Sequence, residues 1–275
     1  MDSQLFHIFR NTPLGRETLL QSIYFSKQTN ASLNIYIPKF IKFLMYFDND
    51  VVQVDLDESY LSSPDTALDR VKNLVESNGL SANFIEPKNF TASTLPDIPV
   101  NFDFMCSPRS ISDLTSKIGL GHIGTRVRRI VQSAKFPVLI TTPVYSEWNN
   151  ITVFFGGSHN SIKALKLGIR LSRLTGKELF IFTQLDGKKR EHYQEILEKE
   201  ELQKEINLMV TKWNFYGSKS FEENLYNVPH DSLAIVGAYG HSVIKNIIFG
   251  SKMEKIQSTI QNNFLVVGPN YGQVS

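Results

Sequence analysis

The sequence predicts an α/β protein made of two repeated units, each built on a parallel sheet of five strands. Short apolar runs alternate with segments of helical periodicity, which is the pattern of βαβ units. Within these runs apolar and polar residues do not alternate, as is typical of strands that a parallel sheet buries on both faces. The same order of runs then occurs twice along the chain.

The repeat is visible as two offsets between the halves. The segment TNASLNIYI at 29–37 aligns with TGKELFIFT at 175–183, at an offset of 146 residues. Gly124-Thr125 aligns with Gly250-Ser251 at an offset of 126, so the first copy carries about twenty extra residues in its middle. We expect two domains, at 1–145 and 151–275.

The second half is predicted to contain five strands and three helices. The first helix has an apolar stripe at helical period, formed by Ile162, Leu165, Ile169 and Leu171. The elements are a strand at 152–155, a helix at 161–174, a strand at 179–183, a helix at 190–210, strands at 213–216 and 233–238, a helix at 251–261 and a strand at 264–268.

The first half follows the same order, with a fourth strand at 102–106, and contains one additional element. The segments 41–47 and 51–56 flank the cluster Asp48-Asn49-Asp50, which favours a turn, and they predict a β-hairpin inserted into the first domain. We expect this hairpin to pack on a neighbouring element and to have a structural role.

Composition excludes several classes of protein. Of the 275 residues 41% are hydrophobic and 20% charged, which is typical of a globular protein, and a net charge of +2 gives no reason to expect a nucleic acid as partner. The single cysteine, Cys106, excludes an intrachain disulfide and is interpreted as a small buried side chain. The longest apolar stretch, 40–47, is too short to span a membrane, and the start lacks the layout of a signal peptide. We expect a cytoplasmic protein without a membrane partner.

A glycine-rich pattern after the fourth strand of the second half is the strongest functional signal. Gly237 and Gly240 are followed, after nine residues, by Gly250-Ser251 at the predicted start of a helix. Glycines let the backbone approach a ligand closely, and a helix start with a serine hydroxyl favours an anion such as phosphate. The alternative is that the glycines only serve turns and that Ser251 only caps its helix.

This pattern, Gly-x₂-Gly-x₉-Gly-(Ser/Thr), resembles the ATP-binding motif of the universal stress protein family. Gly237, Gly240, Gly250 and Ser251 match every defined position. The resemblance extends over both halves and implies, for each, a doubly wound Rossmann-like fold of the adenine nucleotide alpha-hydrolase type. It also implies that the two halves pair as two protomers would, so that the chain is either a pseudo-dimeric monomer or a homodimer.

The sequence departs from the family pattern at the end of the first strand. Nucleotide-binding members usually carry an aspartate there, and the aligned positions are Gly156 in the second half and Arg10 in the first. Counting back from Gly124, the two glycine positions of the first half fall on Ile111 and Leu114, whereas counting forward from the strand end they fall on Cys106 and Arg109. The first domain is therefore interpreted as degenerate and unable to bind ATP in the manner of the family.

From the resemblance we expect a stress-response or regulatory protein that binds ATP, with or without Mg²⁺, in its second half. The phosphates would lie on the Gly237–Gly240 loop and the Ser251 helix start, with His241 as a further loop candidate, and the base near Phe154, Gly156 and Gln184. No general base or pair of metal-binding carboxylates is visible beside the loop, so at most slow hydrolysis is expected. The alternative is a protein-interaction module of the same fold that binds no nucleotide.

Four other patterns are interpreted as structural or coincidental. The GxGxxG string at 119–124 does not directly follow a strand, and the strings at 122–125 and 252–255 only partly match the signatures of adenylate-forming enzymes. Ser158 follows Gly156-Gly157 but lacks the closing glycine of a nucleophile elbow, so it is predicted to cap the first helix. The six histidines show no metal-binding spacing.

Overall fold

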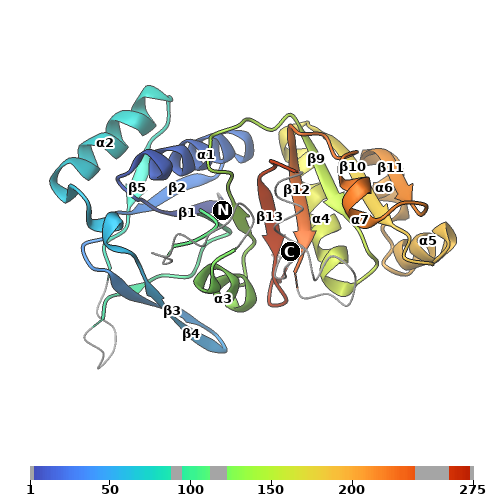
Figure 1. Ribbon diagram of the computed structural model, residues 1–275, viewed down its shortest axis with the longest axis horizontal. Helices are drawn as coiled ribbons and strands as arrows, with labels where there is room; N and C mark the ends of the chain where they lie inside the picture. Colours follow the sequence, from blue (N-terminus) through green and yellow to red (C-terminus); the bar gives the residue numbers. More distant parts are fainter. Residues whose placement is uncertain (1–2, 88–94, 112–122, 239–259, 273–275) are drawn as a thin grey trace. The chain divides into compact units, whose positions relative to one another are not determined.

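The computed structural model describes residues 3–87, 95–111, 123–238 and 260–272. The chain divides into two compact units, the first ending at Glu147 and the second beginning at Trp148 (Figure 1). Each unit is an α/β fold on a sheet of five parallel strands, so the predicted fold class is confirmed.

The second unit winds in two directions from its first strand. Its elements are β9 (Asn150–Phe154), α4 (His159–Thr175), β10 (Glu178–Gln184), α5 (Arg190–Lys199), α6 (Gln203–Met209), β11 (Val210–Tyr216), α7 (Phe221–Leu225), β12 (Ser232–Gly237) and β13 (Phe264–Val267). The strand order is β11-β10-β9-β12-β13. The chain thus moves from β9 outward to β11 and returns to β12 on the other side of β9. The switch point of this sheet lies between β9 and β12.

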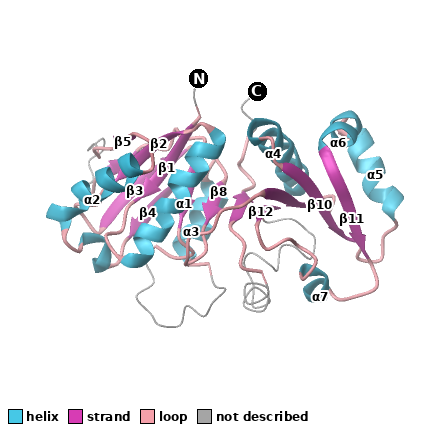
Figure 2. Ribbon diagram, turned by 90° about the horizontal axis from the view of Figure 1, so that it is seen from above, coloured by secondary structure: helices cyan, strands magenta, loops and turns pink. Residues whose placement is uncertain are grey.

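Helices cover both faces of this sheet. Gly168 of α4 lies so close to the sheet that a Cβ there would be 2.3 Å from a methyl group of Val153 and 3.5 Å from one of Leu179. On the opposite face Phe221 of α7 packs against Phe154 and Phe182, with ring centroids 6.5 Å and 5.8 Å apart. Figure 2 shows α7 beside the carboxyl ends of β10 and β11, where the arrowheads lie. This is the doubly wound arrangement that right-handed crossovers produce.

The first unit has the same sheet with an inserted hairpin. Its elements are β1 (Gln4–Ile8), α1 (Pro13–Thr29), β2 (Ser32–Tyr36), β3 (Lys42–Phe47), β4 (Asp50–Asp55), the 3₁₀ helix η1 (Glu58–Leu61), α2 (Pro64–Ser77), β5 (Ala82–Phe84), β6 (Asp97–Ile98), β7 (Phe104–Ser107), α3 (Thr125–Ser133) and β8 (Val138–Ile140). The strand order β8-β7-β1-β2-β5 corresponds to that of the second unit, and α4 begins and ends 146 residues after α1.

The predicted hairpin is confirmed as β3 and β4, which pair antiparallel around the turn Asp48-Asn49. It is fixed to α3 by charged side chains. Arg129 donates to Asp50 at 2.8 Å, Ser133 donates to the same carboxylate, and Arg126 donates to Asp55. The hairpin therefore packs on an element of its own unit.

The prediction of one continuous helix at 190–210 is wrong, because the chain forms two helices there. The turn between α5 and α6 contains Glu201 in the left-handed region, with φ +57°, and the N–H of Leu202 donates back to Leu197 O. Charged residues recur at helical spacing throughout this segment, so the sequence gives no indication that the helix is interrupted. The following strand begins at Val210, earlier than predicted, and most of the predicted helix at 251–261 lies outside the described residues.

Three further expectations can be compared with the described ranges. Cys106 is buried at the end of β7, and burial raises the pKa of its thiol to about 12, which suits an inert side chain. Within those ranges, no helix is long and apolar enough to cross a membrane. The described His, Cys, Asp and Glu side chains also form no group of three that could hold a metal ion.

Candidate functional site

The candidate site lies at the carboxyl ends of β9 and β12. Phe154, the last residue of β9, pairs with Val236, so Gly156 and Gly237 follow at neighbouring strand ends. These ends flank the switch point, where open α/β sheets bind their ligands.

The loop after β9 leads directly into the start of α4. Gly157 adopts φ +75°, and Ser158 then caps the helix, its Oγ accepting from the N–H of Ser161 at 3.3 Å. The predicted capping role of Ser158 is thus confirmed. Because the first N–H groups of a helix have no partner within it, a 17-residue helix starting here favours an anion at this edge.

Gly237 brings β12 against the first turn of α4. A Cβ at this position would lie 2.4 Å from the main-chain carbon of Asn160 and 2.7 Å from the nitrogen of Ser161. The buried amide of Asn160 donates to Ala238 O at 2.6 Å. The beginning of the glycine-rich loop is therefore held against α4 by packing and by one hydrogen bond.

The three residues predicted to lie near a base differ in accessibility. Phe154 is buried, with its ring 4.9 Å from Phe182, whereas Gly156 is partly exposed. Gln184 ends β10, where its amide accepts from Asn224 at 2.9 Å and donates to the main-chain oxygen of Lys219 at 3.3 Å. The structure thus places Gly156 and Gly237 at one switch point and Gln184 at the next strand end.

The other predicted phosphate-loop residues, Gly240, His241, Gly250 and Ser251, lie outside the described residues.

Tyr193 of α5 fixes the end of β10 from the other face of the sheet. Its hydroxyl donates to the main-chain oxygens of Gln184 and Leu185, and burial raises its pKa. Its ring also packs edge-on against Phe155, the residue after β9, with ring centroids 6.3 Å apart. The same side chain therefore contacts the chain after both β9 and β10.

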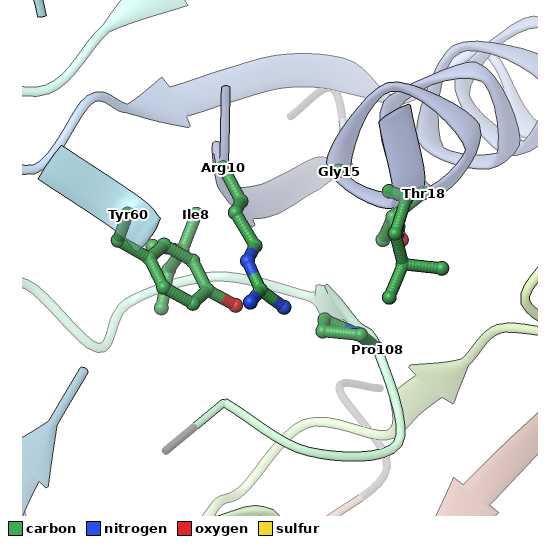
Figure 3. Close-up of a pocket in the computed structure, with 7 residues that line it drawn as sticks. Ile8, Arg10, Gly15, Thr18, Tyr60 and Pro108 are labelled. Carbon is green, nitrogen blue, oxygen red and sulfur yellow. Dashed lines mark hydrogen bonds between the residues drawn. The ribbon is translucent and has the colours of Figure 1, made fainter. Parts of the chain in front are cut away.

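In the first unit the corresponding strand ends are filled by the chain itself (Figure 3). Arg10, which follows β1, forms an ion pair with Asp57 at 3.2 Å, donates to Ser59, and lies 5.2 Å from the ring centre of Tyr60. The pocket bounded by Arg10, Tyr60 and Pro108 holds about 10 Å³, roughly the space of one water molecule. A nucleotide does not fit there without movement of these side chains.

Sequence reasoning missed two polar residues that shape the second unit's site. Asn160 and Asn224 each bind an atom that is distant along the chain, at Ala238 and Gln184. The sequence gives a weak indication of a site role for Asn160, because this residue lies in the first turn of a helix whose cap, Ser158, is predicted. Nothing in the sequence links Asn224 to Gln184.

Comparisons with known proteins agree with this fold. The chain is 25% identical over 195 residues to the universal stress protein Slr1230 of Synechocystis, a match that covers 67% of this chain and 65% of that protein. The chain thus spans slightly less than two thirds of the relative's length. No protein-family model matches the chain. The resemblance to universal stress proteins that the motif indicates is confirmed.

Solved structures share the fold at low sequence identity. A universal stress protein from Archaeoglobus fulgidus superposes with a TM-score of 0.62 at 15% identity, over 98% of this chain and 99% of that one. The cytoplasmic domain of a prokaryotic cation chloride cotransporter superposes with a TM-score of 0.53 at 10% identity, over 97% and 95%. Since such different proteins share the fold, function must be argued from the site.

Proposed function

We propose that this relative of the universal stress proteins binds ATP or a related adenine nucleotide in its second unit, without rapid turnover. The observation that carries the proposal is the contact of Gly237 and Ala238 with Asn160. It brings the first residues of the sequence Gly-x₂-Gly-x₉-Gly-Ser to the start of α4, at the switch point of the sheet. The phosphates would lie between this loop and the helix start.

The remaining strand ends would receive the base and the ribose. Gly156 is partly exposed and has no side chain at its strand end, and Asn224 of α7 holds the amide of Gln184 in place. Any Mg²⁺ would be bound by the phosphate oxygens of the nucleotide. In this role the nucleotide acts as a ligand that stabilises one conformation, as a regulatory protein requires.

Calorimetric titration with Mg-ATP tests the proposal. We expect one site per chain in the native protein and loss of binding in Gly240→Arg, whose side chain would occupy the phosphate loop. Gly79→Arg is the matched control: Gly79 lies in the first unit and a Cβ there would meet nothing within 4 Å, so only its φ of +71° strains the variant. Both variants are first compared with the native protein by circular dichroism and thermal unfolding. Unchanged binding in Gly240→Arg, or fast release of phosphate by the native protein, would contradict the proposal.

A second candidate is an interaction module of the same fold that binds no nucleotide. The glycine at 237 is compatible with this candidate too, because the main chain of Asn160 leaves no space for a Cβ there whether or not a ligand is present. The position aligned with the family's aspartate, Gly156, also carries no acidic side chain. This candidate predicts no heat on titration and no change in the melting temperature with ATP. A rise in the melting temperature that saturates with ATP and disappears in Gly240→Arg would exclude it.

We also propose that the two units arose by duplication. The common strand order and the 146-residue offset between α1 and α4 support the duplication.

We further propose a regulatory stress-response role in the cytoplasm. A buried, unreactive thiol at Cys106 suits a reducing compartment. Light scattering on the purified chain distinguishes a monomer from a homodimer.

A further inference from the structure

A pocket of about 170 Å³ lies on the face of the second unit's sheet that carries α7. Phe180 and Lys212, which pair between β10 and β11, line it on the sheet, and residues 227–229 form its wall. The pocket has a simple cause. α7 is five residues long and packs on Phe154 and Phe182 near the carboxyl ends of their strands, so it does not extend over Phe180.

The floor of the pocket is aromatic. Phe182 stacks on Tyr216, with ring centroids 4.7 Å apart and an interplanar angle of 30°. Phe180 lies two residues before Phe182 on the same face of β10 and is partly exposed, and buried Val228 completes the apolar surface. Such a surface favours a flat apolar group of similar size.

Beside the aromatic floor, four polar side chains line the pocket, and two of them are hydrogen-bonded within the protein: Thr152 accepts from Ser232, and Asn227 donates to the main-chain oxygen of Asn224. Lys212 and Asn214 are two residues apart on β11 and therefore point to the same face. Across the described ranges neither side chain has a hydrogen-bond or ion-pair partner. Glu178, at the start of β10, faces the same side and forms no ion pair with Lys212 within those ranges. An uncompensated ammonium beside an amide favours a carboxylate.

We propose that this pocket binds a small aromatic carboxylic acid, with its ring on Phe180 and its carboxylate between Lys212 and Asn214. The size is appropriate, since a protein cavity of about 150 Å³ accommodates benzene. The site is separate from the proposed nucleotide site, because its lining includes Thr152 and Phe180 within the strands and neither Gly156 nor Gly237. It does not depend on nucleotide binding.

Titration of the full chain with benzoate, followed by ¹⁵N-resolved NMR, tests this proposal. We expect saturable shifts in β10 and β11 and, for Lys212→Met, an affinity at least about tenfold weaker. Lys212 is exposed, and it lies on β11 at the end of the described strand order. Methionine keeps the apolar part of the lysine side chain, so the variant should fold normally. Lys204→Met removes an equally exposed charge from α6 and should leave the affinity unchanged.

Two further titrations separate the parts of the proposal. Benzamide, which has the ring but no charge, should bind about as weakly to the native protein as benzoate does to Lys212→Met. Saturating Mg-ATP should leave the benzoate affinity unchanged. The proposal is overturned if benzoate gives no saturable shifts, if Lys212→Met binds as tightly as the native protein, or if the shifts cluster at the ends of β9 and β12.

Discussion

The side-chain amide of Asn160 donates a 2.6 Å hydrogen bond to the main-chain oxygen of Ala238, 78 residues later in the chain. Both residues are buried. The bond joins the first turn of α4 to the residue that follows β12, across the switch point of the sheet. The position at which the glycine-rich loop begins is therefore determined by a side chain on a different element.

Replacing Asn160 should destabilise the second unit. In Asn160→Ala the buried oxygen of Ala238 loses its donor, and we expect a loss of about 1–3 kcal/mol in the free energy of unfolding. Urea denaturation of the full chain measures it. Asn207→Ala is the control, because Asn207 is exposed on α6 and, among the described residues, its side chain accepts a hydrogen bond only from Gln203. Equal, small effects of both substitutions would show that the Asn160 bond contributes nothing measurable.

Gly237→Ala should cost more than a substitution at a glycine in open space. Its Cβ would meet the backbone of Asn160 at 2.4 Å, and backbone cannot rotate away as a side chain can. We expect a loss of about 2–3 kcal/mol in stability. Gly176→Ala, at the end of α4, meets nothing within 4 Å and has only its φ of +69° to strain it, so about 1 kcal/mol is expected. Denaturation midpoints of the two variants that fall in the opposite order would refute this interpretation.

The ion pair of Arg10 with Asp57 should stabilise the first unit. Asp57 is only 5% exposed, so Arg10→Met leaves a buried carboxylate without its cation, and we expect a loss of about 1–3 kcal/mol. The double variant with Asp57→Asn should lose less than the sum of the two single variants. Lys39→Met is the comparison, because its pair with Glu86 is 66% and 77% exposed and should contribute less than about 0.5 kcal/mol. Additive losses in the double variant would mean that the pair contributes no coupling.

The elements of this protein could be predicted better than the contacts at its site. The α/β class, the hairpin and the cap at Ser158 follow from local patterns, because strand burial, turn residues and helix capping act over a few neighbours. The interruption at Glu201 could not be predicted, since no glycine or proline marks it.

The site depends on contacts between distant parts of the chain. The glycine at 237 suggests a ligand when the sequence is considered alone, whereas the structure gives a further reason for it in the main chain of Asn160. Likewise Arg10 is recognisable from the sequence only as a departure from an aspartate. Its pairing with Asp57 depends on how η1 folds back over the end of β1. Such contacts follow from tertiary packing and leave no local signal.

The hairpin should be attached to α3 by a weak, salt-sensitive interaction. Hydrogen bonds from Arg129 and then Ser133 lower the pKa of Asp50 to about 2. Because this value is below that of the unfolded chain, the contribution is complete above about pH 4 and is lost as the pH falls toward 2. Both side chains are more than a third exposed, so a double-mutant cycle with Asp50→Asn and Arg129→Gln should give at most about 1 kcal/mol. The coupling should decrease in 1 M salt, and a salt-independent coupling would contradict an ionic origin.

His7 should make the first unit sensitive to mild acid. Its ring is 1% exposed in β1, with Nδ1 2.8 Å from the hydroxyl oxygen of Ser22, and burial lowers its pKa to about 3. The unfolded chain, with a pKa near 6.5, takes up a proton that the folded chain does not. The contribution of neutral His7 to the free energy of unfolding is therefore complete above about pH 6.5 and is lost as the pH falls toward 3.

Urea denaturation between pH 7.5 and pH 5 measures this contribution. Relative to His7→Gln, the native protein should lose about 2 kcal/mol more stability by pH 5, at about 1.4 kcal/mol for each pH unit below the unfolded pKa. His159→Gln, at an exposed position at the start of α4, should retain the pH dependence of the native protein. The same pH dependence in His7→Gln as in the native protein would show that another group causes the acid sensitivity.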